Sequence, residues 1–345
     1  MLKSVNFLKS RHGRKKQKSS CFIFLLITFI GSVANAQVNI GYTSYSNIDS
    51  CIELSNEYVK VILDPGTGGR IIEYSSQGNN VLFTRLTDSP DMDRRRLYPD
   101  GGRFDIGPEN ITPRRSLLWR GKWSAEITKP GRVKLVSQVD PAVGVRIIRE
   151  FSLDKTSSEL RIIQTMINES ETPQRYCFWS RTFVKGGGIC LNPLNPKSRY
   201  PKGFVITDGQ KLNYRPALPE GTEIRQGVFE IRQAQKIPKF NFDSNEGWIA
   251  YLAKSNQIFI KKFNVYPTEI YGDVVASNIS IWYSMDNVCE IEPMSPWVLL
   301  KPGEHYSFEE DWYLFEYNFP GKDGAHIDEI RKMISDLSMP LQVED

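Results

Sequence analysis

Histidine is scarce in this chain of 345 residues, which has only His12, His305 and His326. The five cysteines form no C-x-x-C pair and have no histidine at the spacing of a zinc site, and no G-x-S-x-G motif is present. The Gly-rich stretch at 66–69 precedes no helical pattern, so it predicts a turn between strands and not a phosphate cradle. These absences argue against triad and metal chemistry, and we predict no metal and no cofactor.

Acidic residues are missing from the first 36 positions, which hold seven Lys and Arg residues. An apolar run, CFIFLLITFIGSVA, occupies 21–34, and ANA precedes Gln37. A basic start, a short apolar core and a small-residue cleavage site are the pattern of a signal peptide. We therefore expect residues 1–36 to be a signal peptide cleaved after Ala36, and the protein to be periplasmic or secreted. An uncleaved N-terminal anchor is the alternative.

The remaining residues, 37–345, have no excess of positive charge, with 37 Lys and Arg against 40 Asp and Glu. The short run 94–96 is their one arginine cluster. This balance argues against nucleic acid and, after cleavage, against a membrane as partner. No repeat or linker divides residues 37–345, so we expect a single domain. Its cysteines leave open one disulfide or only free buried thiols, and the oligomeric state is not predicted.

Helical periodicity is nearly absent, whereas short β-branched and aromatic runs alternate with Gly, Pro, Asn and Asp. This pattern predicts an all-β, antiparallel sandwich or barrel. Only 324–337, GAHIDEIRKMISDL, has apolar residues at helical spacing, and we expect a short C-terminal helix there. Two regions, 84–118 and 191–222, read as long loops, where all-β proteins usually handle ligands.

The stretch CEIEPMSPWVLLKPGEHYSF, 289–308, places Glu290 and Glu292 on either side of Ile291. In a strand the two carboxylates share one face and Ile291 points to the other. Such a pair can share a proton, which raises the pKa of one carboxyl toward the range of a general acid. The alternative is an ordinary strand surface on which each carboxylate is solvated or paired with an arginine.

The segment 288–315, VCEIEPMSPWVLLKPGEHYSFEEDWYLF, resembles the closing segment of the galactose mutarotase-like superfamily. The segments 54–83 and 165–184 are similar to its opening strands and its central strand pair. The resemblance implies a β-supersandwich with a sugar cleft on its larger sheet. It also implies that Glu292 is the base that takes a proton from the anomeric hydroxyl. Ser180 stands where the family has a proton-donating histidine, which disfavours ordinary mutarotation because serine is a poor acid.

The stretch YPDGGRFDIGPEN, 98–110, resembles the superfamily's pocket-lining loop and contains Arg103 and Asp105. Together with Trp179, Arg181, Glu290 and Glu292 these residues form the predicted substrate site. Two cations and two anions there would suit a sugar with an acidic substituent. A solvated loop held by surface ion pairs is the alternative. We also expect that Lys261, Lys262 and Tyr271 reach the pocket.

The sequence therefore predicts a secreted carbohydrate-binding protein, its partner a small sugar or a polysaccharide. Epimerase-like chemistry with Glu292 as the base is one hypothesis. A non-catalytic sugar-binding or accessory module is the alternative, because the acid of the family is replaced. A polysaccharide lyase or hydrolase is a third possibility, since this type of scaffold hosts such enzymes as well.

Overall fold

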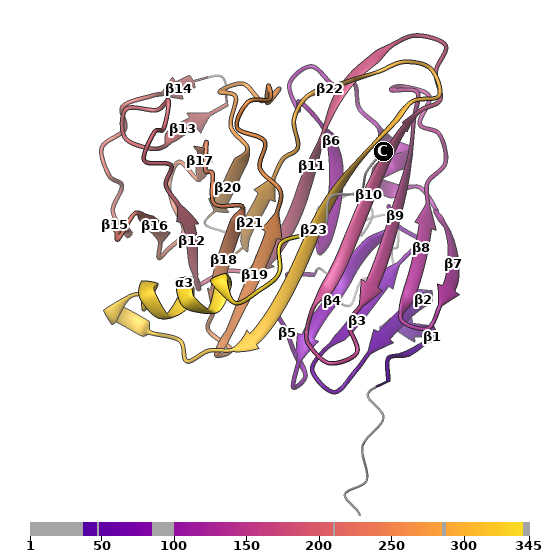
Figure 1. Cartoon of the computed structure of the whole chain (residues 1–345), viewed down its shortest axis with the longest axis horizontal. Coiled ribbons are helices and arrows are strands. Elements are labelled where there is room, and N and C mark those ends of the chain that lie inside the picture. The colour runs from indigo at the N-terminus through magenta and orange to yellow at the C-terminus, as the bar shows by residue number, and fades with distance from the viewer. Residues whose placement is uncertain (1–36, 47, 85–99, 210, 285–287, 341–345) are drawn as a thin grey trace, which may run out of the picture. The chain divides into compact units, whose positions relative to one another are not determined.

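The computed structural model describes residues 37–46, 48–84, 100–209, 211–284 and 288–340, all of which fall in one compact unit. The predicted signal peptide and the arginine run 94–96 lie outside the described residues. Two sheets face each other, and every strand pair is antiparallel (Figure 1). The fold is therefore the all-β sandwich that the strand pattern predicts.

The larger sheet has 13 strands, and the candidate site described below lies on it. In spatial order its main path is β1 (Asn39–Tyr45), β2 (Ile48–Ser55), β3 (Lys60–Asp64), β4 (Arg70–Ser76), β6 (Gly102–Gly107), β11 (Gln174–Lys185), β21 (Val288–Pro293), β20 (Ile279–Ser284), β17 (Lys239–Phe242), β13 (Val205–Asp208) and β14 (Lys211–Asn213). Two short strands join it at the side: β5 (Asn79–Asn80) pairs with β4, and β22 (Val298–Leu300) pairs with β11.

The second sheet has ten strands and packs against the first. Its order is β15 (Thr222–Arg225), β16 (Val228–Ile231), β12 (Ile189–Pro193), β18 (Trp248–Ala253), β19 (Gln257–Phe263), β23 (His305–Glu316), β10 (Leu160–Asn168), β9 (Val145–Leu153), β8 (Arg132–Val136) and β7 (Ser124–Lys129). Figure 1 shows β23 running between β19 and β10, so the C-terminal strand joins the two halves of this sheet.

The main core lies between the sheets and is built by residues at every second strand position. In β21, Cys289 and Ile291 belong to this core, so Glu290 and Glu292 must point to the opposite, outer face of the larger sheet. The same alternation in β11 sends Phe178 into the core and Trp179 to the outer face.

One predicted loop contains a central strand. Within 84–118, β6 pairs with β11 over six residues, and a short helix, α2 (Ser116–Arg120), follows. The strand was missed because its sequence, GRFDIG, is rich in glycine and charge, which are depleted in strands. Gly102 is needed there, since a Cβ at this position would collide with the Trp312 ring of the other sheet.

The predicted C-terminal helix is present as α3 (Ile327–Ser335). Ile327, Ile330 and Ile334 pack it on the outer face of the smaller sheet, against residues of β18 and β19 such as Trp248 and Ile260. A 3₁₀ turn, η1 (Gly321–Asp323), precedes it. Among the described residues no helix has the length and apolar character needed to span a membrane.

Candidate functional site

The six predicted site residues lie together on the outer face of three adjacent strands. In the register of β6 and β11, Arg103 is opposite Arg181 and Asp105 is opposite Trp179. In that of β11 and β21, Phe183 is opposite Glu290. The face therefore combines aromatic, basic and acidic side chains: Arg103, Asp105, Trp179, Arg181, Glu290 and Glu292.

Glu292 is the most enclosed acid of this face, with 0% of its surface exposed. One carboxylate oxygen, Oε2, accepts hydrogen bonds from Trp179 Nε1 at 2.7 Å and from Lys239 Nζ at 3.0 Å. Burial raises the pKa of Glu292, but the charges of Lys239 and Arg181 outweigh burial, so that the net pKa lies below its ordinary value. Glu292 is therefore a carboxylate at neutral pH.

Glu290, the second acid of β21, is also buried but is shifted in the opposite direction. It accepts a 2.6 Å hydrogen bond from Arg181 Nε. Burial and the neighbouring charge of Glu292 outweigh the effect of Arg181 and raise the pKa of Glu290 to about 8. The pair thus holds one carboxylate firmly ionised and binds a proton at the other near neutral pH.

Both carboxylate oxygens of Asp105 accept hydrogen bonds from an arginine that the sequence analysis did not identify. Arg115 donates to its two oxygens, from Nε at 2.5 Å and from Nη2 at 2.6 Å, and both side chains are buried. Arg181 Nη1 lies 3.9 Å from Asp105, too far for a hydrogen bond. The role of Asp105 is therefore to fix Arg115 beneath the loop that follows β6.

Arg103 is buried, with 6% of its surface exposed, yet its Nε and Nη2 have no acceptor among the described residues. Its guanidinium lies 4.9 Å from the centre of the Trp119 ring. Burial and the charges of Arg70 and Arg181 lower the pKa of Arg103 to about 9. Arg103 is thus a buried cation that pairs with no acidic side chain among the described residues.

A hollow of about 460 Å³ opens beside these residues. Trp179 and Lys239, the two hydrogen-bond donors to Glu292, form part of its wall, and Trp282 and Asn241 form another part. Its rim is made by Glu109, Asn110, Thr207, Asp208, Gly209, Leu212, Pro238, Asp273 and Val274. The hollow therefore combines two indole rings with charged and amide groups above the central strands.

The sequence prediction missed Lys239, Asn241 and Trp282. A usable signal exists in KFNF, where Lys239 and Asn241 alternate with Phe240 and Phe242. The two phenylalanines join the core, so the polar pair must face outward. What the sequence does not contain is the pairing of β17 with β20, which brings Lys239 next to Trp282.

Three residues that were expected to reach the pocket lie elsewhere, and Ser180 also faces away from the hollow. Ser180 points into the core, where its hydroxyl and that of Thr182 accept hydrogen bonds from Lys261 Nζ at 2.8 and 2.9 Å. Lys261 lies between the sheets and pairs with Glu310 at 3.0 Å, because it alternates with outward residues of β19.

Lys262 and Tyr271 also lie away from the hollow. Lys262 Nζ donates to the carbonyl oxygens of Ile334 and Leu337, so it holds the end of α3. The Tyr271 hydroxyl accepts a hydrogen bond from the Tyr266 backbone at 3.0 Å, and the ring is buried outside the wall of the hollow.

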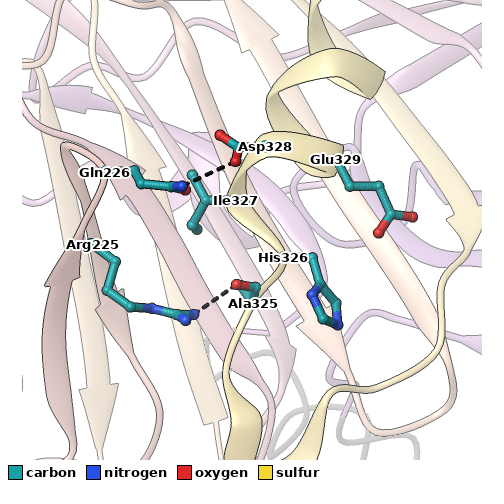
Figure 2. A pocket seen from close by; sticks show the side chains of 7 residues that line it. All are labelled: Arg225, Gln226, Ala325, His326, Ile327, Asp328 and Glu329. Atoms are coloured by element: carbon teal, nitrogen blue, oxygen red, sulfur yellow. Dashed lines mark hydrogen bonds between the residues drawn. The ribbon is translucent and has the colours of Figure 1, made fainter.

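A second hollow, of about 670 Å³, lies at the start of α3 (Figure 2). Figure 2 shows Gln226 bound to Asp328 and Arg225 bound to the carbonyl of Ala325, with His326 beside them. Arg225 also pairs with buried Glu230 at 2.6 Å. These contacts fasten the helix to β15 and β16, which accounts for the polar groups of this hollow without a ligand.

Metal and thiol chemistry find no support among the described residues. No group of three or more His, Cys, Asp or Glu side chains there is placed to hold a metal ion. Cys51, Cys177, Cys190 and Cys289 are buried free thiols. Burial raises the pKa of Cys177 to about 12, so that this thiol is a poor nucleophile.

Comparison with solved structures places the fold. No family model matches the sequence, and no curated protein matches it. A galactose mutarotase-like protein from Lactobacillus casei superposes with a TM-score of 0.54 at 9% identity, over 77% of this chain and 100% of the other. One from Clostridium acetobutylicum gives 0.53 at 14%, over 82% and 100%. The chain has the galactose mutarotase-like fold.

The chain also superposes on about half of a longer protein of known structure. A TPR-domain containing protein from Parabacteroides distasonis superposes with a TM-score of 0.55 at 15% identity, over 86% of this chain and 50% of the other. At these identities the likeness establishes the galactose mutarotase-like architecture, and the chemistry must be argued from the residues of the site.

Proposed function

We propose that this protein binds a carbohydrate in the hollow beside Glu292. The observation that carries the proposal is the placement of Trp179 and Trp282 with Lys239 and Asn241 around one cavity on the central strands. Sugars present flat C–H faces that stack on indole rings and hydroxyls that bond to charged and amide groups. The galactose mutarotase-like fold agrees with this function.

The wall of this site is preorganised before a sugar arrives. Trp179 is held by its hydrogen bond to Glu292, and Lys239 Nζ lies 4.8 Å from the centre of the Trp179 ring. A fixed ring loses little rotational freedom on binding, which favours affinity. In this proposal Glu292 acts first as the anchor of the two groups that meet the sugar.

Interconversion of sugar anomers is the second candidate, favoured by the opposite pKa shifts of Glu290 and Glu292. As base, the Glu292 carboxylate would accept the proton of the anomeric hydroxyl while the bond from the anomeric carbon to the ring oxygen breaks. The ring oxygen would take a proton from an acid, for which protonated Glu290 is the candidate. Because Glu292 has 0% exposure, Lys239 must first move aside.

Proton NMR of freshly dissolved α-anomers, with and without protein, separates the two functions. Line broadening without faster anomer exchange supports binding alone. Faster exchange that disappears in both Glu292→Gln and Glu290→Gln supports the acid–base pair. Neither effect, with neutral and acidic sugars, would contradict both functions.

Export of the protein is part of the proposal. A signal peptide at 1–36 would deliver residues 37–345 to the periplasm or beyond, where free sugars and polysaccharides are available. The intact mass of protein recovered outside the cytoplasm tests this. A mass that begins at Gln37 supports export and cleavage, whereas a full-length, membrane-bound product would indicate an uncleaved anchor.

A further inference from the structure

We propose that Arg103 and Arg181 form an anion subsite that takes the carboxylate of an acidic sugar, a uronic acid. The inference rests on the proposed sugar site and names its substrate class. It depends on two observations on the outer face of the larger sheet. One basic side chain there, Arg103, has no acidic partner among the described residues, and two of its hydrogen-bond donors have no acceptor.

The other basic residues of this face already have an acidic partner. The pairs are Arg70 with Asp100, Arg115 with Asp105, Arg181 with Glu290, and Lys239 with Glu292. Arg103 is the remaining cation, and within the described chain no ion pair reaches it. Since Asp105 is occupied on both oxygens by Arg115, the nearest acid of its own strand is not available to Arg103.

The guanidinium of Arg103 is held in place although it has no counter-ion. It packs over the Trp119 ring, and Arg115 packs over the same ring at 4.7 Å. Its Nε and Nη2 groups are the donors that form a planar fork, which matches the two oxygens of a carboxylate. A buried charge is costly unless it is paired, so these two unpartnered donors mark a place where an anion would be stabilised.

Arg181 supplies the second half of the subsite. It is opposite Arg103 in the strand register, and its side chain is 15% exposed. While Nε binds Glu290, Nη1 lies 3.9 Å from both Asp105 and Glu109, beyond hydrogen-bond distance. Arg181 therefore keeps a donor for an anion, and its guanidinium lies 5.3 Å from the centre of the Trp179 ring, which lines the hollow.

The test compares sugars that differ only at the carboxylate. Isothermal titration of the full chain measures the affinities for glucuronate and glucose, and for galacturonate and galactose, at constant ionic strength. We expect wild-type protein to bind each uronate at least about tenfold more tightly than the matching hexose, the scale of a charge-assisted pair. In Arg103→Gln this ratio falls to near one, and Arg103→Lys retains part of it. Arg132→Gln, an exposed arginine on the other sheet, is the control and retains the full ratio.

A second experiment measures the Tm of the protein with glucuronate, with inorganic sulfate and with glucose 6-phosphate. An increase in Tm with glucuronate that exceeds the increase with sulfate, and that is lost in Arg103→Gln, supports the sugar carboxylate. Equal increases in Tm with sulfate and glucuronate would indicate a site for free oxyanions. A larger increase in Tm with glucose 6-phosphate than with glucuronate would indicate a site for sugar phosphates. Either result overturns the assignment to uronic acids.

The experiments distinguish a missing anion subsite from a missing sugar site. Hexose binding without a preference for the uronate contradicts the anion subsite and leaves the proposed function intact. A uronate effect on Tm that requires Arg103, with no binding of any neutral sugar, supports the anion subsite and leaves the proposed function intact. The absence of both effects contradicts both proposals.

Discussion

Trp179 Nε1 donates a 2.7 Å hydrogen bond to Glu292, so an aromatic wall of the hollow is fixed by the buried carboxylate of the neighbouring strand. Lys239 completes the arrangement, because it binds the same oxygen at 3.0 Å and lines the same hollow. The acid that the sequence pattern singles out therefore positions two groups of the wall of the hollow.

Replacement of Glu292 by glutamine should weaken sugar binding and also reduce stability. The amide removes the negative charge that pairs with Lys239, and breaking a buried pair in this way costs about 3–5 kcal/mol in other proteins. Because Lys239 is 22% exposed and can reach water, we expect the lower end of that range. Urea unfolding and sugar titration measure the two effects. Unchanged stability would show that the ion pair contributes nothing to the fold.

Replacement of Trp282 by alanine should reduce sugar affinity by about fivefold, since an aromatic contact of this kind is worth roughly 1 kcal/mol. Trp282 lines the hollow and is only half-buried, so the fold should tolerate the change. Tyr42→Ala, which removes an aromatic ring 63% exposed on the edge strand β1, is the control and should leave the affinity unchanged. Equal affinities of wild type and Trp282→Ala would place the sugar elsewhere.

The stability of the protein should depend on pH through Glu290. Its pKa is raised to about 8 in the folded state, above the ordinary value of 4.5, so the native state holds a proton that the unfolded chain releases. This stabilisation is complete below about pH 4.5 and is lost as the pH rises to about 8, with a limit of roughly 1.4 kcal/mol per pH unit for one proton.

Urea unfolding of wild type and Glu290→Gln between pH 5 and pH 9 tests the assignment. The free energy of unfolding of wild type should fall with pH more steeply than that of the variant. Parallel pH profiles would mean that Glu290 remains ionised beside Arg181 across the whole range.

The buried pair of Lys261 and Glu310 should be essential to the core. Both side chains are 0% exposed and lie 3.0 Å apart, and Trp312 Nε1 also donates to Glu310. Lys261→Met should cost about 3–5 kcal/mol because it leaves a buried charge alone. Adding Glu310→Gln should recover much of the loss, since the amide is neutral and still accepts from Trp312. A double variant no more stable than Lys261→Met would contradict this.

The fold could be predicted from the sequence wherever a strand shows alternation. Val288–Pro293 places Cys289 and Ile291 in the core, which fixes the shared face of Glu290 and Glu292. The C-terminal helix followed from the spacing of its isoleucines. In contrast, the alternation in β6 covers only Arg103–Ile106 and lies between glycines at 102 and 107, so its sequence resembles a loop more than a strand.

The site was only partly predictable because its members meet through long-range pairing. The sequence identified the acids of β21 and the arginines of β6 and β11. It did not indicate that Arg115 would occupy Asp105 or that Lys239 would reach Glu292, since both contacts depend on how distant segments pack. The facing of Ser180 also became visible only in the structure, where its hydroxyl binds Lys261 between the sheets.

Saturation-transfer NMR with a panel of neutral and acidic monosaccharides tests the central claim, that the hollow beside Glu292 binds a sugar, most directly. We expect saturation of sugar ring protons by wild-type protein and by Tyr42→Ala, and a clearly weaker signal at the same sugar concentration in Trp282→Ala. Saturation that is equal in Trp282→Ala and wild type, or absent with every sugar of the panel, would contradict it.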